Sequence, residues 1–165
     1  MSFYDNFKQY ILADESDGCE LSEFKHAFFK LDDWYEQVQQ IERELRINIP
    51  IGLKELYKEL GYGFLCSSDF NCVDRIMYPI EIVDFYLRRD VYEYNEVVDE
   101  YDLNDGKIVF FEIDSDMFLT VSLHPNENGK YPVYSFDKEI AISIQDFIIK
   151  MDKKTDYYLD CFADK

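Results

Sequence analysis

Residues 33–63, DWYEQVQQIERELRINIPIGLKELYKELGYG, contain two runs of apolar side chains that recur at helical spacing. The first run is Val38, Ile41 and Leu45, and the second is Leu53, Leu56, Tyr57 and Leu60. Pro50 separates the runs, because the residue before a proline is biased away from helix while proline itself suits a first helical turn. Gly61 suits the left-handed conformation that often ends a helix. The stretch therefore predicts two consecutive helices, each with one buried face.

The charge of this helix pair argues against a DNA-reading helix-turn-helix. Glu42, Glu44, Glu55 and Glu59 load the pair with negative charge. The whole chain has 35 Asp and Glu against 17 Lys and Arg, a formal net charge of −18. This balance disfavours direct binding to nucleic acid or to an anionic membrane, since both repel it, and it favours a cationic partner. Solubility alone is the alternative explanation of the charge.

Length and composition predict one globular domain in a reducing compartment. The 165 residues suffice for one buried core, and 47% hydrophobic with 18% aromatic residues are too many for a disordered acidic tail. The four cysteines form no Cys-x-x-Cys pair, which is typical of a reduced cytosolic protein; they are Cys19, Cys66, Cys72 and Cys161. We find no signal peptide and no run of the roughly 18 apolar residues that a membrane span needs. We therefore expect a cytoplasmic protein.

The flanking regions complete the expected fold. Residues 3–12 predict a short amphipathic helix, whereas residues 20–32 fit a helix or a strand equally well. Pro79 opens a further helix, and Ser143 with Asp146 three residues later resembles the capping box of a closing helix. Between them, strands are predicted at residues 108–113, 117–123, 131–136 and 140–141. This order predicts an α+β fold with N-terminal helices, a central antiparallel sheet and a C-terminal helix.

The sequence contains no recognisable catalytic, cofactor or metal motif. Its two histidines, His26 and His124, lie far apart and beside no nucleophile motif. Asp114-Ser115-Asp116 brings two carboxylates together, but a polar turn between two strands is the better interpretation. We therefore expect a protein that is not an enzyme and has no cofactor. An enzyme that uses two of its many carboxylates is the third alternative.

The order of several motifs resembles a known family. The first motif comprises Ile41-Glu42, Leu45, Ile47, Ile49-Pro50, Leu53, Leu56-Tyr57 and Gly61-Tyr62-Gly63. Further matches follow at residues 74–76, Pro79, Ile82-Val83, residues 109–112, residues 133–136, Ala141, Ser143-Ile144 and Phe147-Ile148. Together they resemble the SUKH superfamily, which includes fungal cell-wall-assembly regulators and many bacterial immunity proteins. The chain departs from the pattern at residues 114–116, where many members carry a Gly-Asp pair.

The resemblance, over residues 34–151, implies an α+β fold without catalytic residues. In bacteria it implies an immunity protein, or antitoxin, that neutralises a polymorphic toxin, frequently a nuclease. We expect residues 34–165 to form the SUKH-like domain and residues 1–33 to form a helical extension packed on the same domain. An acidic inhibitor suits a nuclease, because the groove that binds phosphates must be basic. The alternative is a non-enzymatic interaction module that binds another cellular protein. The oligomeric state stays open.

Residues 90–105 are the predicted contact surface for this basic toxin. They contain seven acids, three tyrosines and no Lys or Arg. The tyrosines are expected to anchor the partner, since tyrosine is favoured at interface centres, and the carboxylates to steer its approach. The predicted partner-binding residues are Tyr92, Tyr94, Asp99, Glu100, Tyr101 and Asp102. The alternative is that these tyrosines pack the segment onto the core.

Overall fold

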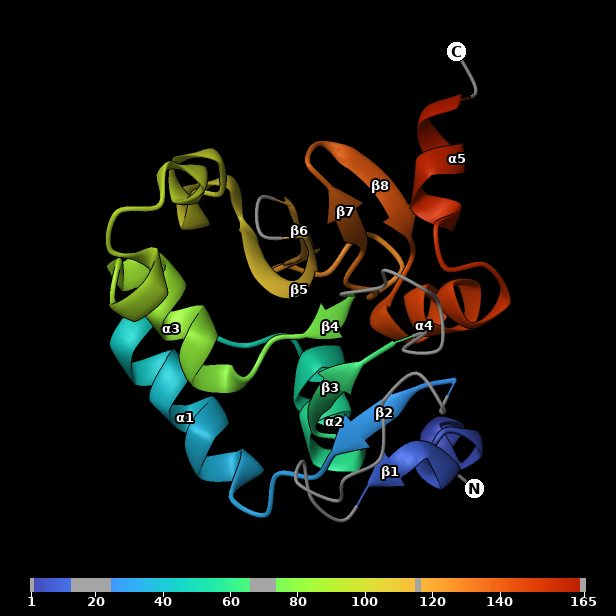
Figure 1. Cartoon of the computed structure of the whole chain (residues 1–165). Helices are drawn as coiled ribbons and strands as arrows, with labels where there is room; N and C mark the ends of the chain where they lie inside the picture. The colour runs from blue at the N-terminus through green and yellow to red at the C-terminus, as the bar shows by residue number, and fades with distance from the viewer. Residues whose placement is uncertain (1, 13–24, 66–73, 115–116, 164–165) are drawn as a thin grey trace.

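The computed structural model describes residues 2–12, 25–65, 74–114 and 117–163 (Figure 1). Within them, eight strands form one sheet in the order of the sequence, and each strand pairs with its neighbours. The strands are β1 (Ile11–Leu12), β2 (Ala27–Phe29), β3 (Tyr62–Phe64), β4 (Arg75–Ile76), β5 (Lys107–Asp114), β6 (Met117–Ser122), β7 (Val133–Ser135) and β8 (Lys138–Ala141). Pairing is antiparallel from β2 to β8, and only β1 and β2 are parallel. The expected α+β class with a central antiparallel sheet is thereby confirmed.

Five α-helices and several short 3₁₀ turns accompany the sheet in the described residues. The α-helices are α1 (Trp34–Leu45), α2 (Ile51–Glu59), α3 (Pro79–Leu87), α4 (Ile144–Lys153) and α5 (Tyr157–Ala163). The 3₁₀ turns are η1 (Phe3–Asn6), η2 (Lys8–Tyr10), η4 (Asp90–Tyr92), η5 (Glu96–Glu100) and η6 (Leu103–Asp105). Helix α1 packs against α2 and α3, and α2 packs against α4. In Figure 1, α1 and α3 lie side by side at the left, while α4 and α5 lie at the right. None of the helices in the described ranges is long and apolar enough to cross a bilayer.

The predicted helix pair is confirmed as α1 and α2. Val38 and Ile41 are buried on the inner face of α1, as their spacing predicted. The glutamate Glu42 ties the turn after α1 together, because its carboxylate accepts a hydrogen bond from the Ile49 amide at 3.0 Å. Pro50 occupies the N-cap of α2, one residue earlier than the first-turn position that we expected. The pair is therefore fixed by local signals that the sequence carries.

Two glycines join this helix pair to the sheet. Gly61 has φ +82°, and a Cβ added there would lie 2.0 Å from the backbone oxygen of Phe29. Gly63 has φ +140°, and its added Cβ would lie 2.2 Å from the oxygen of Ala27. Only glycine permits so close an approach of β3 to β2. The Gly-Tyr-Gly motif is therefore the place where α2 ends and the sheet begins.

The N-terminal region differs from the expected helix. Residues 3–10 form the two 3₁₀ turns η1 and η2, held by Ser2, whose hydroxyl accepts from the Tyr4 amide at 3.3 Å. The segment that fitted a helix or a strand contains β2, whose residues are all buried. Periodicity could not separate the two, because a strand buried on both faces shows no alternation. The division of the chain at residue 33 stays a prediction.

The closing elements follow the predicted order. Strands β5 to β8 form the expected meander, and Phe110 and Phe111 of β5 place their rings 5.8 Å and 5.1 Å from that of Phe147 in α4. Ser143 caps α4 by accepting from the Asp146 amide at 3.1 Å. The reciprocal bond to Asp146 comes from the Ile142 amide, at 3.0 Å, one residue before the capping box places it. Helix α5 was not predicted.

Candidate partner-binding surface

The connection between α3 and β5 forms the candidate surface, and we call its residues 90–105 the acidic segment. Left-handed residues Arg88 (φ 54°) and Asp90 (φ 54°) end α3 and turn the chain away from it. Side chains then cap the short turns: Asn95 Oδ1 accepts from the Val97 amide at 3.0 Å, and Asp102 Oδ1 accepts from the Asn104 amide at 2.9 Å. Such local side-chain bonds compete with a continuous helix. The acidic segment therefore folds as three 3₁₀ turns at one end of the molecule (Figure 1).

All seven carboxylates of the acidic segment are exposed. They are Asp90, Glu93, Glu96, Asp99, Glu100, Asp102 and Asp105. Among the described residues, Asp99 is the one member of the seven that forms an ion pair, with the exposed guanidinium of Arg88. The charge of the segment is therefore left largely without internal compensation, and it creates a negative field at this end of the molecule.

The three predicted tyrosines have different environments. Tyr94 is 87% exposed, whereas Tyr92 and Tyr101 are 4% and 6% exposed. The buried ring of Tyr92 lies edge-on to Phe85 at 5.2 Å, and the hydroxyl of Tyr101 accepts from the Phe118 amide at 3.1 Å. Burial raises the pKa of both buried phenols, so they stay neutral at physiological pH. These contacts match the packing alternative for the two buried tyrosines, and a contact role for all six predicted residues stays a prediction.

Three exposed apolar side chains in or beside the acidic segment were not predicted from the sequence. Val91 is 73% exposed, Leu87 ends α3 with its side chain partly exposed, and Phe136 lies in the β7–β8 turn. Val91 and Leu87 lie close to Tyr94 in the sequence. Their exposure could not be predicted, because apolar residues in a helical pattern are normally expected to be buried. Phe136 has φ 53°, a conformation that is strained for a bulky residue, and its ring stacks on Tyr101 with centroids 5.6 Å apart. The surface thus combines carboxylates with exposed apolar groups.

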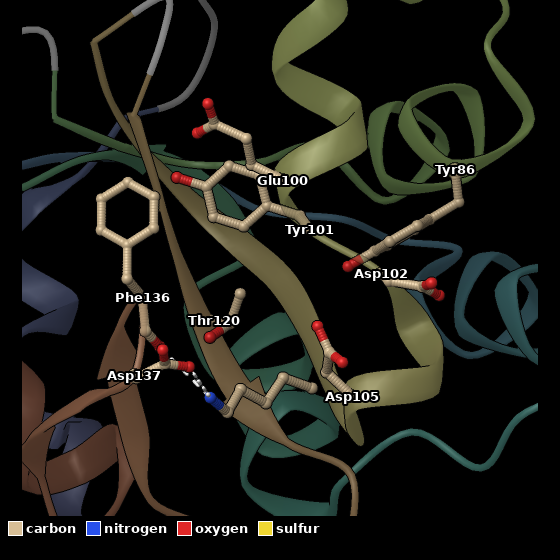
Figure 2. A pocket seen from close by; sticks show the side chains of 9 residues that line it. Tyr86, Glu100, Tyr101, Asp102, Asp105, Thr120, Phe136 and Asp137 are labelled. Atoms are coloured by element: carbon tan, nitrogen blue, oxygen red, sulfur yellow. Dashed lines mark hydrogen bonds and ion pairs between the residues drawn. The ribbon is translucent and has the colours of Figure 1, made fainter.

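A cavity of about 210 Å³ opens beneath the acidic segment (Figure 2). We call it the acidic cavity; its lining residues are Tyr86, Glu100, Tyr101, Asp102, Asp105, Lys107, Thr120, Phe136 and Asp137. The lining thus contains four carboxylates and one ammonium group. Lys107 Nζ donates to the Phe136 carbonyl at 3.2 Å, lies 3.6 Å from Asp137 Oδ1 and sits 4.3 Å from the centre of the Tyr134 ring. The lysine charge is therefore directed at the β7–β8 turn.

A second hollow of about 450 Å³ shares three of these residues, Tyr86, Tyr101 and Asp102. It extends along α3 toward α1, where Glu44 accepts a hydrogen bond from Arg89 at 3.1 Å. The two hollows lie next to each other, since both are lined by the same three side chains. Both hollows border the acidic segment, and their combined lining contains more carboxylates than bases.

The sequence also raised the histidines, the cysteines and residues 114–116 as possible catalytic or metal-binding groups. His26 is fully buried and hydrogen-bonded to Asp152 Oδ1 at 2.7 Å, and burial lowers its pKa despite that carboxylate. No three His, Cys, Asp or Glu side chains are arranged to hold a metal ion in the parts of the chain that the structure describes. The side chains of all four cysteines, and those of Asp114, Ser115 and Asp116, lie outside the described ones.

Comparison with known proteins places this fold in a family. The family model SUKH_6, described as SMI1-KNR4 cell-wall, matches residues 35–150, from α1 into α4. Immunity protein YxxD of Bacillus subtilis (strain 168) is 33% identical over 141 residues, which cover 82% of this chain and 94% of that protein. The family match includes the acidic segment and all the lining residues of the acidic cavity. The resemblance inferred from the motifs is confirmed, and the chain belongs to the SUKH family.

Proposed function

We propose that this protein is an immunity protein that binds a cognate toxin, a basic nuclease domain, and neutralises it inside the producing bacterial cell. The observation that carries the proposal is the exposed acidic segment, seven carboxylates with one ion pair among the described residues. Its similarity to Immunity protein YxxD over most of both chains supports the same role. Both lines agree with a non-catalytic inhibitor.

Electrostatics favours a nuclease as the partner. A nuclease must present positive charge to the phosphate backbone, and a protein of net charge −18 competes with nucleic acid for that surface. The same charge accelerates encounter with the toxin and repels nucleic acid itself. An immunity protein has to reach its toxin before the toxin reaches the cell's own nucleic acid. A fast, charge-steered association serves that need.

The contact residues divide into two roles in this proposal. Tyr94 and Val91 supply exposed apolar area that the toxin buries, while Asp99, Glu100 and Asp102 steer the approach. The buried Tyr92 and Tyr101 hold the acidic segment on the core and present it to the toxin. The contribution of Tyr92 to binding is therefore indirect.

The test is a cleavage assay with the toxin encoded beside this gene. Purified toxin domain is mixed with increasing amounts of the full chain, and degradation of DNA and of RNA is followed separately. The proposal predicts that one of the two activities falls to background at a stoichiometric ratio. Undiminished cleavage of both substrates in excess of this protein contradicts it. Tight binding without inhibition would instead support the interaction-module alternative.

A further inference from the structure

We propose that the acidic cavity is a receptor for one arginine side chain of the protein partner. This inference deepens the proposed function and rests on it for the identity of the partner. Its starting point is a buried polar group in the cavity wall that no described residue satisfies. Thr120 is 4% exposed and lines the acidic cavity, and its buried Oγ1 has no hydrogen-bond partner among the described residues.

The position of Thr120 in the sheet directs its side chain toward the cavity. Thr120 of β6 pairs directly with Tyr134 of β7, and directly opposed residues of antiparallel strands share a face. Lys107, another lining residue, lies over the Tyr134 ring and so marks the same face. Figure 2 shows Thr120 between Asp105 and Asp137, below the ring of Tyr101 in that view. A buried hydroxyl without a partner is costly unless something binds to it.

The walls of the cavity match a guanidinium group. Glu100, Asp102 and Asp105 supply carboxylates that the lysine does not face, because Lys107 is directed at Asp137 and the Phe136 carbonyl. A guanidinium carries five donors in a planar fork and pairs with carboxylates bidentately. Tyr101 and Phe136 stack on each other, and a flat cation can lie against an outer ring face of this pair.

The size of the acidic cavity and its ligand set favour a single side-chain head group over the other common occupants. About 210 Å³ is below the range of roughly 300–1,000 Å³ typical of small-molecule sites, and it suits one side-chain head group. The lining carboxylates form no metal-ligand cluster among the described residues. A lysine would bring charge without the planar fork, and it would meet Lys107 as a point charge. Arginine is therefore the occupant that uses the carboxylates, the rings and the Thr120 hydroxyl together.

The strained turn supports the same reading. Phe136 occupies a positive-φ position where glycine is the favoured residue, and it places an aromatic ring at the cavity mouth. Backbone strain of this kind persists where the surrounding structure enforces it, frequently at binding sites. Here the stacking of Phe136 on Tyr101 links the β7–β8 turn to the acidic segment. The cavity is thereby formed from elements that are far apart in the sequence.

The first test uses a small probe and needs no toxin. Acetyl-arginine amide is titrated into the full chain and followed by NMR, with acetyl-norleucine amide as the uncharged control. We expect saturable shifts at Lys107, Thr120 and Asp105 with the arginine compound alone. Thr120→Val, which keeps the shape and removes the hydroxyl, should weaken these shifts. Ser135→Ala is the matched control, because Ser135 Oγ is also buried without a hydrogen-bond partner in the described part of the chain but lies outside the cavity lining. Equal shifts with both compounds overturn the proposal.

The second test uses the toxin domain encoded beside the gene. Asp105→Asn and Thr120→Val should each raise the Kd of the complex, by about thirtyfold for the carboxylate, mainly through faster dissociation. Glu93→Gln changes the net charge equally but lies outside the cavity lining, and it should leave the dissociation rate unchanged. Wild-type dissociation rates in both cavity variants overturn the arginine receptor even where cleavage is fully inhibited. Conversely, a cavity that binds the arginine probe in a chain that inhibits no toxin contradicts the proposed function alone.

Discussion

Two regions of the molecule treat their carboxylates differently. Arg75 binds two glutamates within the fold. The seven carboxylates of the acidic segment face solvent, and one of them forms an ion pair with a described side chain. The guanidinium of Arg75 in β4 binds Glu81 of α3 through two hydrogen bonds and Glu112 of β5 at 3.0 Å. These half-buried groups join three elements, and the hydrogen bonds to Glu81 raise the pKa of Arg75.

The difference shows how one acidic chain divides its charge. Carboxylates that meet a base across elements stabilise the fold, because removing either partner leaves a half-buried charge uncompensated. Even an exposed ion pair contributes only about 0–1 kcal/mol to folding, so the exposed carboxylates of the acidic segment add little to stability. Their proposed role is the contact with a basic partner. The predictions below test this division, beginning with the largest effect.

Arg75→Met should give the largest loss of stability. It leaves Glu81 and Glu112 close together without their cation, and we expect the free energy of unfolding to fall by about 3 kcal/mol, at the low end for a broken buried pair. The matched control is Arg88→Met, which removes the exposed pair with Asp99 and should cost under about 1 kcal/mol. Urea denaturation of both variants measures the difference. Equal losses would remove the distinction between the two regions.

Tyr94→Ala should affect binding and not folding. Losing an exposed aromatic anchor is expected to weaken the complex with the toxin by about 2 kcal/mol, or roughly thirtyfold in Kd, with stability unchanged within about 0.5 kcal/mol.

Tyr101→Phe should do the reverse. It loses the hydroxyl that accepts a hydrogen bond from the Phe118 amide, so it should cost about 1 kcal/mol of stability and leave the Kd near wild type. Calorimetric titration and thermal melting of both variants separate the roles. A larger binding loss in Tyr101→Phe would make Tyr101 the anchor.

A smaller effect concerns a third internally bound carboxylate, Asp152. It lies 2.7 Å from both Lys25 Nζ and His26 Nε2. Burial lowers the pKa of His26 below 6.5 in the folded state, so the unfolded chain binds the proton first as pH falls. Stability is then highest above pH 6.5 and declines as pH falls toward the folded pKa of His26.

Denaturation curves between pH 5 and 8 measure this decline. His26→Phe should flatten it, and His124→Gln, in an exposed loop, should retain it. A decline of the same slope in His26→Phe would assign the pH dependence to other groups.

Much of the fold could be predicted because its signals are local. The helix pair of residues 33–63 follows from periodicity, Pro50 and Gly61, and the closing helix from Ser143. Strand β2 could not be assigned, since its burial depends on Gly61 and Gly63 approaching from far along the chain. The turns of residues 90–105 likewise follow from side-chain caps that periodicity does not report.

The candidate site was predictable in its charge and not in its geometry. The sequence alone located the seven acids, because a run without Lys or Arg is visible in one dimension. Which tyrosine is exposed depends on the packing of Tyr92 and Tyr101 against Phe118, a tertiary contact. Thr120 and Phe136 reach the acidic cavity through the β6–β7–β8 pairing, and an isolated Thr or Phe carries no sequence signal for that.

The central claim is that the acidic segment exists for a basic partner. Its most direct measurement is the association rate with the toxin domain, over a range of salt concentrations, for Asp99→Asn, Glu100→Gln and Asp102→Asn combined. The matched variant combines Glu127→Gln, Glu139→Gln and Asp156→Asn, three exposed acids outside the segment.

The account predicts that the first variant associates about tenfold more slowly at low salt, with a flatter salt dependence, while the second stays close to wild type. Equal slowing of association in both variants would show that the acidic segment acts only through the net charge of the protein and not through its position. A change confined to the dissociation rate would contradict the steering role.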